Sequence, residues 1–256
     1  MCGVSKMPNA SHLDFETRSG PYRAMNLRAL ISVLIVCAVT LVAGCGRPLT
    51  ENERAFAQKI HGPAVDMDRV RLARGALVGS VTFKRPARPR VTCRERILPP
   101  PKSDIVTARP AAVVLFNRIH FTNDWYLEDY MPRYPERLHL IEAMLLAHEM
   151  THIWQWQNRE LTGYHPLKAA AEHGRVEDPY LFDADVEHAF LDYGYEQQGA
   201  IVEEYVCCRA LAPEAARTQR LHAMLEEVFP VSELPQSRAH DVVLPWNEAE
   251  LNGICS

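Results

Sequence analysis

The sequence lacks a marked excess of charge of either sign, a C-x-x-C pair and any visible internal repeat. It holds 28 lysines and arginines against 32 acidic residues, which gives a formal net charge of −4. A mildly acidic chain with scattered charge gives no electrostatic reason to bind nucleic acid, so we expect no nucleic-acid partner. Without a C-x-x-C pair, a cysteine-ligated metal is a weak interpretation.

The sequence also lacks an apolar run of ordinary transmembrane length. The apolar segment from Ala29 to Ala43 is short for a span of about 20 residues, which argues against a transmembrane anchor. A basic start, Met25-Asn26-Leu27-Arg28, precedes this segment, and Gly44-Cys45 follows it. This order is that of a secretory signal, and its end resembles the bacterial lipoprotein box, in which the cysteine is lipidated.

We therefore predict four parts of the chain. Residues 1–24 belong to a wrongly assigned upstream start, 25–44 form a lipoprotein signal peptide, Cys45 carries the lipid, and 45–256 form a single domain. A domain of this size can bury its own core. The predicted location is the bacterial cell envelope, with residues 47–51 as a short tether after the lipid.

Four cysteines remain in the mature chain beyond the lipidation site: Cys93, Cys207, Cys208 and Cys255. An exported location permits disulfides, and four cysteines allow three pairings between which the sequence does not choose. A bond between the adjacent Cys207 and Cys208 is geometrically awkward, which favours Cys93 and Cys255 as the partners.

Local patterns predict an α+β arrangement of helices and short strands. The capping box Thr50-x-x-Glu53 opens a short helix that Gly62-Pro63 ends. The remaining predictions are strands within 65–81, a proline-rich loop at 84–101, a strand at 111–121, a helix at 136–159 with Pro135 as its first residue, a long loop at 163–195, helices at 195–211 and 213–229, and an irregular tail.

The most informative segment is His148-Glu149-Met150-Thr151-His152, which reads H-E-x-x-H. It lies in the stretch 136–159, which has no internal proline or glycine and has the periodicity of one helical face. Two histidines four apart project from one face, about 5.4 Å apart along the helix axis, so both can bind one Zn²⁺. Glu149, between them, is the candidate general base that acts on the zinc-bound water.

Catalytic zinc takes three protein ligands, so a third must come from elsewhere in the chain. On the helix predicted at 195–211, Glu196, Ala200 and Glu203 share one stripe. A small residue there, Gly199 or Ala200, would let the two helices approach closely. We predict Glu196 as the third ligand. The alternatives are Glu203 first, and then Asp183, Asp185, His173 and His188.

These features together resemble a known family. A strand, an H-E-x-x-H helix and a glutamate on a later helix look like the zincin metallopeptidases of the glutamate-ligand type, the gluzincins. The metzincin extension H-E-x-x-H-x-x-G-x-x-H is absent, because position 155 is Gln and position 158 is Asn. The resemblance implies a zincin-like fold, in which a small β-sheet packs on the active-site H-E-x-x-H helix and a second ligand-bearing helix.

A narrower resemblance covers about residues 110–210. The segment 148–155 is similar to the H-E-[LM]-T-H-[VI]-x-Q core of bacterial metallopeptidases linked to contractile injection systems and Rhs/Vgr-type proteins. The segment 193–202, YGYEQQGAIV, is similar to their E-Q-Q-A-x-I-V segment. Gly199 differs from the small residue that these proteins usually have there, a departure from which we expect little consequence.

The mechanism that follows is metal-assisted hydrolysis of a peptide bond. Glu149 takes a proton from the water and returns it to the leaving amine. The tetrahedral oxyanion needs a second donor, for which the candidates are Tyr195, Tyr193, Tyr205 and His165. The resemblance further implies that the strand at 113–121 runs along the cleft and pairs with an extended substrate.

The predicted function is thus a zinc-dependent metallopeptidase that acts on a peptide or protein and is held at the membrane by its lipid. One alternative is a catalytically inactive zinc-binding lipoprotein that serves as a binding module, and peptidase activity of the metal-loaded protein separates the two. A third interpretation is a structural lipoprotein with an accidental motif, which a lack of stoichiometric metal would favour.

Overall fold

The computed structural model describes the chain from Gly46 onward with short gaps. The described residues are 46–76, 79, 81–84, 89–103, 105–173, 178–183, 188–232, 234 and 241–256, with the backbone alone for 81–84 and 105–108. The chain divides into two units, Met1–Gly44 and Cys45–Ser256, and every described residue belongs to the second. The predicted signal peptide, the residues before it, Cys45 and Asp185 lie outside the described residues. Within the described part of the chain, no helix has the length and apolar character that a membrane crossing needs.

The second unit is a mixed α+β domain with several helices and small sheets, as predicted. The helices are α2 (Glu51–His61), α3 (Cys93–Ile97), α4 (Leu140–Gln157), α5 (Arg159–Thr162), α6 (Pro166–Glu172), α7 (Tyr195–Leu211) and α8 (Ala216–Glu226), with 3-10 turns η1 (Gly62–Ala64), η2 (Met67–Arg69) and η3 (Phe190–Asp192). The strands are β1 (Arg71–Arg74), β2 (Val81–Lys84), β3 (Ile105–Ala108), β4 (Ala112–Leu115), β5 (Arg118–Phe121), β6 (Leu138–His139) and β7 (Val242–Val243).

The largest described sheet has three strands in the order β1-β5-β4, with β1 parallel and β4 antiparallel to β5. The prediction of a single strand at 111–121 is therefore wrong in one respect. Phe116 and Asn117 form a turn that folds the segment into the β4–β5 hairpin, with Leu115 opposite Arg118. The apolar, β-branched composition signals a strand but does not show where it turns.

The helix α4 begins later than the sequence predicted. Pro135 is not its first residue, because Leu138 and His139 pair as β6 with the distant β7 and the helix starts at Leu140. The prediction for α7 matches its bounds, and α2 is opened by the predicted capping box. The helix predicted at 213–229 is the shorter α8, and the proline-rich loop contains α3, which Thr92 and Glu95 cap.

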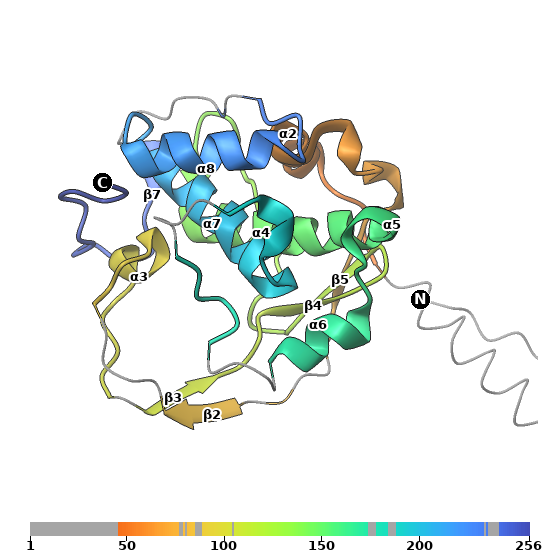
Figure 1. Ribbon diagram of the computed structural model, residues 1–256, viewed down its shortest axis with the longest axis horizontal. Coiled ribbons are helices and arrows are strands. Elements are labelled where there is room, and N and C mark those ends of the chain that lie inside the picture. Colours follow the sequence, from red (N-terminus) through yellow and green to blue (C-terminus); the bar gives the residue numbers. More distant parts are fainter. Residues whose placement is uncertain are drawn as a thin grey trace, which may run out of the picture. The chain divides into compact units, whose positions relative to one another are not determined.

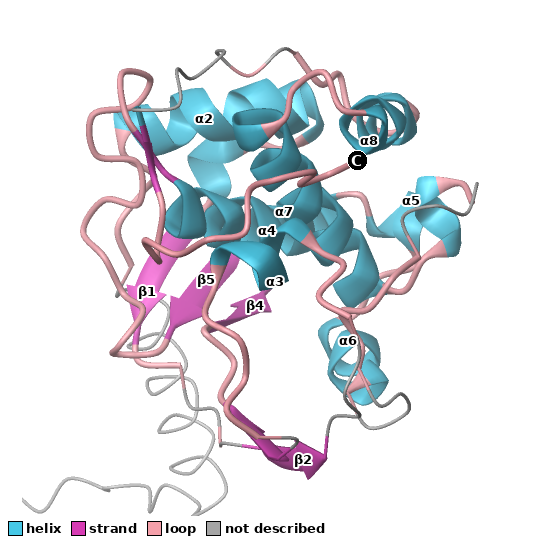
Figure 2. Cartoon of the chain, turned by 90° about the vertical axis from the view of Figure 1, so that its left-hand side faces the viewer, coloured by secondary structure: helices cyan, strands magenta, loops and turns pink. Residues whose placement is uncertain are grey.

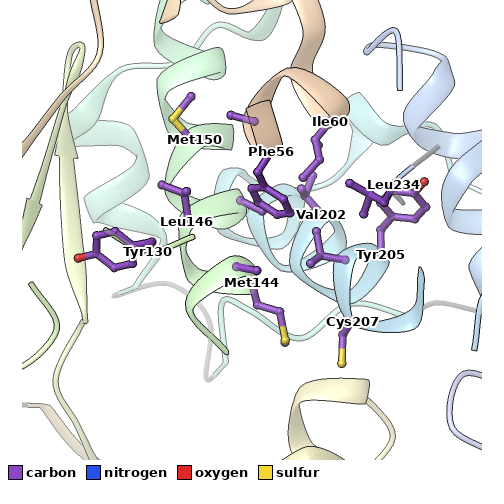
Figure 3. Packing of buried hydrophobic residues seen from close by; sticks show 14 of the residues in the cluster. Phe56, Ile60, Tyr130, Met144, Leu146, Met150, Val202, Tyr205, Cys207 and Leu234 are labelled. Carbon is purple, nitrogen blue, oxygen red and sulfur yellow. The ribbon is translucent and has the colours of Figure 1, made fainter. Parts of the chain in front are cut away.

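Figures 1 and 2 show the arrangement of these elements in layers. The helices α2 and α8 lie on one side, α4 and α7 pack along each other in the middle, and the sheet of β1, β5 and β4 lies beyond α4. Apolar side chains from α2, α4 and α7 meet between the layers, among them Phe56, Leu146 and Val202 (Figure 3). Burial of this apolar surface holds α4 and α7 together.

Two disulfides attach other segments to α7. Cys93 of α3 bonds to Cys207, and Cys208 bonds to Cys255 near the C-terminus. The adjacent cysteines thus bond to distant partners and not to each other. The helix that carries Glu196 is fixed both by packing against α4 and by covalent links to two distant segments.

Candidate metal centre

The packing of α4 against α7 brings His148, His152 and Glu196 together. One ligand atom from each residue lies within 4.8 Å of the others, and all three residues are buried. Glu196 Oε2 is 3.3 Å from His148 Nε2 and 3.4 Å from His152 Nε2. Two imidazole nitrogens and one carboxylate oxygen that converge in this way could hold a metal ion, and they are donors of the kinds that zinc sites use.

The side chain of Gln155 sets the orientation of His152. Its Oε1 lies 2.8 Å from His152 Nδ1, and its own Nε2 donates to Gln198 Oε1 (2.9 Å) and to the carbonyl of Tyr195 (3.0 Å). Because the amide group donates on its nitrogen side, its oxygen accepts from Nδ1–H of the imidazole. Nε2 of His152 is then directed toward Glu196, and in the neutral imidazole this nitrogen carries the lone pair that a metal ligand requires.

A second carboxylate lies behind His148. Glu203 Oε2 is 3.6 Å from His148 Nδ1, on the side of the ring opposite Glu196. Glu203 is paired in turn with Arg94 of α3, at 2.9 Å. Glu203 was the second choice for the third ligand, and the structure places it beside His148 and outside the three-residue cluster.

Gly199 allows the close approach of α7 to His148. A Cβ at this position would lie 2.7 Å from His148 Cε1, 2.8 Å from Nε2 and 2.9 Å from Nδ1. Real Cβ atoms essentially never show contacts under 3.0 Å, so a larger residue would displace the imidazole. This close approach argues against the expectation that the departure at position 199 has little consequence.

The cluster combines buried charges of opposite sign. Burial alone would raise the pKa of Glu196, but the neighbouring His152 and His148 outweigh it and hold the pKa below its usual range. Burial alone would lower the pKa of His148, but Glu196 and Glu203 raise it to about 10. The carboxylates therefore favour a positive charge at this point, which a proton or a metal cation can supply.

The candidate base Glu149 is buried on α4, between His148 and His152 in the sequence. Burial raises the pKa of its carboxyl, and the two neighbouring imidazoles oppose the shift. A glutamate with a raised pKa is suited to accept and return a proton near neutral pH.

The remaining ligand candidates that the structure describes do not join the three-residue cluster. His173 is the nearest of them, with Nε2 3.8 Å from Glu196 Oε1. The His188 ring packs against Tyr193, and the Asp183 carbonyl accepts a hydrogen bond from the Tyr193 hydroxyl.

The four candidate oxyanion donors contact residues outside the three-residue cluster. The Tyr205 hydroxyl lies 2.9 Å from His222 Nδ1, the Tyr195 hydroxyl donates to the carbonyl of Thr162, and the Tyr193 hydroxyl donates to Asp183. His165 caps α6 by accepting a hydrogen bond from the backbone of Leu167.

Tyr180 and His173 lie beside the cluster. The Tyr180 hydroxyl is 3.1 Å from His173 Nε2, and the Tyr180 ring centroid is 5.9 Å from that of His148. Sequence reasoning missed Tyr180 and considered His173 only as a ligand. Neither residue lies in a periodic segment, so no local pattern marked them.

The position of His173 follows from the contact between α6 and α7. Glu172, the last residue of α6, accepts hydrogen bonds from the backbone nitrogens of Tyr195 (3.1 Å) and Glu196 (3.2 Å). A carboxylate at the N-terminus of a helix satisfies free backbone donors and complements the helix dipole. This contact places the following residue, His173, beside Glu196.

Comparison with known proteins gives two related matches. No family model matches the chain. Over 191 residues, which are 73% of this chain and 15% of the relative, the sequence is 27% identical to the type VI secretion system spike protein VgrG2b of Pseudomonas aeruginosa. The solved effector domain of VgrG2b aligns with 78% of this chain and 96% of its own length, at 23% identity and a TM-score of 0.44. The chain thus spans about 15% of the length of that curated relative. The sequence match agrees with the expected likeness to Vgr-type proteins.

Proposed function

We propose that the chain is a zinc-dependent metallopeptidase with a zincin-like arrangement of its site. The observation that carries the proposal is the convergence of His148 Nε2, His152 Nε2 and a Glu196 oxygen, from two helices, within 4.8 Å of one another. Nitrogen and carboxylate donors in this number favour zinc over calcium or magnesium, which prefer more oxygen ligands. The three residues therefore fit a catalytic zinc ion.

A zinc ion held by these residues would supply Lewis acidity and lower the pKa of a bound water. The chain's own groups perform the proton transfers. Glu149 accepts a proton from the attacking water and delivers it to the leaving amine, and its raised pKa suits both steps. His173 and Tyr180, which lie on the Glu196 and His148 side, replace the earlier candidates as donors to the oxyanion.

The substrate that we propose is an extended peptide segment. The strand β4 is an outer strand of the described three-stranded sheet and packs against α4, which carries the H-E-x-x-H residues. An outer strand presents unpaired backbone groups to which an extended peptide can add. Peptides that pair with β4 would be recognised mainly through their backbone.

The location that we propose is the bacterial cell envelope, with lipid on Cys45. The order of a basic start, an apolar segment and Gly44-Cys45 supports this proposal. Two disulfides in the described domain agree with an oxidising compartment. The relative is named a spike protein of a secretion system, and its solved part is named an effector domain. On that basis we propose an effector-type hydrolase for this domain.

The test separates metal binding from chemistry. His148→Ala and Glu196→Ala should lose zinc, measured by elemental analysis, and should lose peptide hydrolysis with it. Glu149→Gln should keep zinc and lose about 10²–10⁴-fold in hydrolysis rate, as expected for removal of a general base. His139→Ala, at the start of α4, is the matched control and should change neither quantity.

Two results would overturn parts of this proposal. If Glu196→Ala keeps full zinc while Glu203→Ala loses it, the third ligand is Glu203. If the native protein holds stoichiometric zinc but cleaves no peptide or protein, the inactive binding module replaces the peptidase.

A further inference from the structure

The turn between β4 and β5 presents apolar side chains to solvent. Leu115 is 43% exposed and Phe116 is 53% exposed. The Phe116 ring packs edge-on against Trp156 near the end of α4, with the ring centroids 4.7 Å apart. We call Leu115, Phe116 and Trp156 the apolar tip. Single exposed apolar residues are ordinary, but a cluster of large ones marks an interaction site.

The backbone of this turn is unfavourable for the residue that it carries. Phe116 has a φ of +60°, in the left-handed region, where a bulky side chain is uncommon. Glycine or asparagine would form the same turn at lower conformational cost. A large aromatic residue at this exposed point therefore indicates a role outside the fold itself.

Arginines surround the apolar tip. Arg118 lies opposite Leu115 in the hairpin, and Arg71 lies opposite Arg118 in the neighbouring strand pair. The guanidinium of Arg159 lies 4.7 Å over the Trp156 ring. Aromatic rings flanked by arginines match the interface of a bilayer, where rings lie at headgroup level and basic groups meet anionic lipids.

The N-terminal end of the described chain is fixed beside these arginines. A Cβ on Gly46 would lie 3.2 Å from Arg71 Cβ and 3.3 Å from Arg118 Nη1. Arg47 exchanges two backbone hydrogen bonds with Leu72 of β1, at 2.9 and 2.8 Å. The prediction of a tether at 47–51 is therefore wrong, because Arg47 is bound to the sheet and α2 begins at Glu51. The residue after Cys45 thus lies against the basic groups next to the apolar tip.

From these contacts we infer that the apolar tip and its arginines dock the domain onto an anionic phospholipid bilayer. A lipid on Cys45 would enter the bilayer one residue away from Gly46, so the attachment point and the docking surface coincide. The inference rests on the proposed lipidation for the presence of a membrane, but not on the proposed peptidase activity. Docking would give the domain one fixed orientation toward the membrane.

Photochemical crosslinking of the full chain tests this orientation. A benzophenone amino acid replaces Phe116 in one sample and Leu251 in another, which is 40% exposed in the C-terminal segment that contacts α3. In Figure 1, the C-terminal segment lies beside α3, on the side away from β5. The purified protein is reconstituted into vesicles of phosphatidylethanolamine and phosphatidylglycerol, and lipid adducts are counted by mass spectrometry.

We expect the lipid-adduct yield at 116 to exceed that at 251 by about fivefold or more. A single basic residue near an anionic surface contributes about that factor to the equilibrium between the docked and the undocked domain. Vesicles of phosphatidylcholine alone should reduce the yield at 116 by a similar factor. In a third sample, with the benzophenone at Leu115, Phe116→Asn should lower the yield while keeping the turn, because asparagine tolerates a positive φ.

Equal yields at 116 and 251 in anionic vesicles would overturn the inference. Crosslinks from 116 to a second copy of the chain, in place of lipid, would also overturn it and assign the tip to a dimer. The mass of the N-terminal peptide in the same sample reports lipidation separately. If Cys45 is unmodified while 116 still crosslinks to lipid, docking stands and lipidation fails.

Discussion

Substitution of Gly199 by alanine tests the geometry of the metal centre most directly. The added Cβ would lie 2.7 Å from His148 Cε1, whereas ordinary van der Waals contact begins at 3.4 Å. The imidazole or the helix must therefore move by about 0.7 Å, the difference between these two distances. Bond lengths in metal sites hold to about ±0.2 Å, so His148 would no longer meet a shared ion correctly.

The effects on metal binding and on folding should differ in size. Disturbing the orientation of a ligand typically costs about 10–100-fold in metal affinity, and we expect at least that loss for Gly199→Ala. The free energy of unfolding should change less. Alanine gains about 1 kcal/mol over glycine in a helix interior, and overpacking costs about 1–3 kcal/mol. The net destabilisation is thus at most about 2 kcal/mol, which an ordinary domain tolerates.

The assay combines a zinc titration against a chromophoric chelator with thermal unfolding of the metal-free protein. Gly79→Ala is the matched control, because no heavy atom lies within 4 Å of its added Cβ, and it should bind zinc like the native chain. Native zinc affinity in folded Gly199→Ala would refute the reasoning, since the imidazole would then have room that the structure does not show.

Three further predictions concern a carboxylate beside the site, a buried histidine and a disulfide. Glu203→Gln should weaken zinc binding by about 10–100-fold, measured by competition titration, because Glu203 faces His148 Nδ1. The metal-free native protein should lose stability in acid because of the buried His61, and His61→Gln should not show this loss. Burial lowers the pKa of His61 to about 3, below its ordinary 6.5, so between these values the unfolded chain binds the extra proton. The metal-free native protein should lose up to about 1.4 kcal/mol per pH unit as the pH falls through this window. Replacing Cys208 and Cys255 by serine should cost about 4 kcal/mol, from a sequence separation of 47 residues, measured by urea unfolding.

Each of these predictions has a contrary outcome, and the first has a control variant. Glu214→Gln, at an exposed position, should leave zinc affinity unchanged, and the same affinity in Glu203→Gln would show that Glu203 does not support its neighbour. Parallel acid profiles for native protein and His61→Gln would show that the buried imidazole does not drive the loss. An unchanged urea midpoint in the double serine variant would mean that packing alone holds the C-terminal segment.

Elements specified by short-range patterns could be predicted from the sequence. The helix α7 has the predicted bounds, and the capping box at Thr50 and Glu53 opens α2. These signals depend on residues within about four positions of one another, so they survive without knowledge of the fold. The placement of His148 and His152 on one helical face belongs to the same class.

Elements that depend on distant partners could not be predicted. The start of α4 is displaced because β6 pairs with β7 more than one hundred residues later, and no pattern near Pro135 records that pairing. Arg47 is bound to β1 by contacts with Leu72, although its neighbours in the sequence are typical of a linker.

The sequence by itself determined which residues could serve as a metal centre, because the spacing of H-E-x-x-H on a helix is a local property of the chain. Only the tertiary structure decided the rest of the site. The packing of α4 on α7 turns Glu196 toward both imidazoles and Glu203 toward Arg94. It also leaves no room for a Cβ at position 199 unless His148 or the helix shifts. A stripe of residues on one helix does not specify which of them faces a partner helix, or how closely that helix approaches.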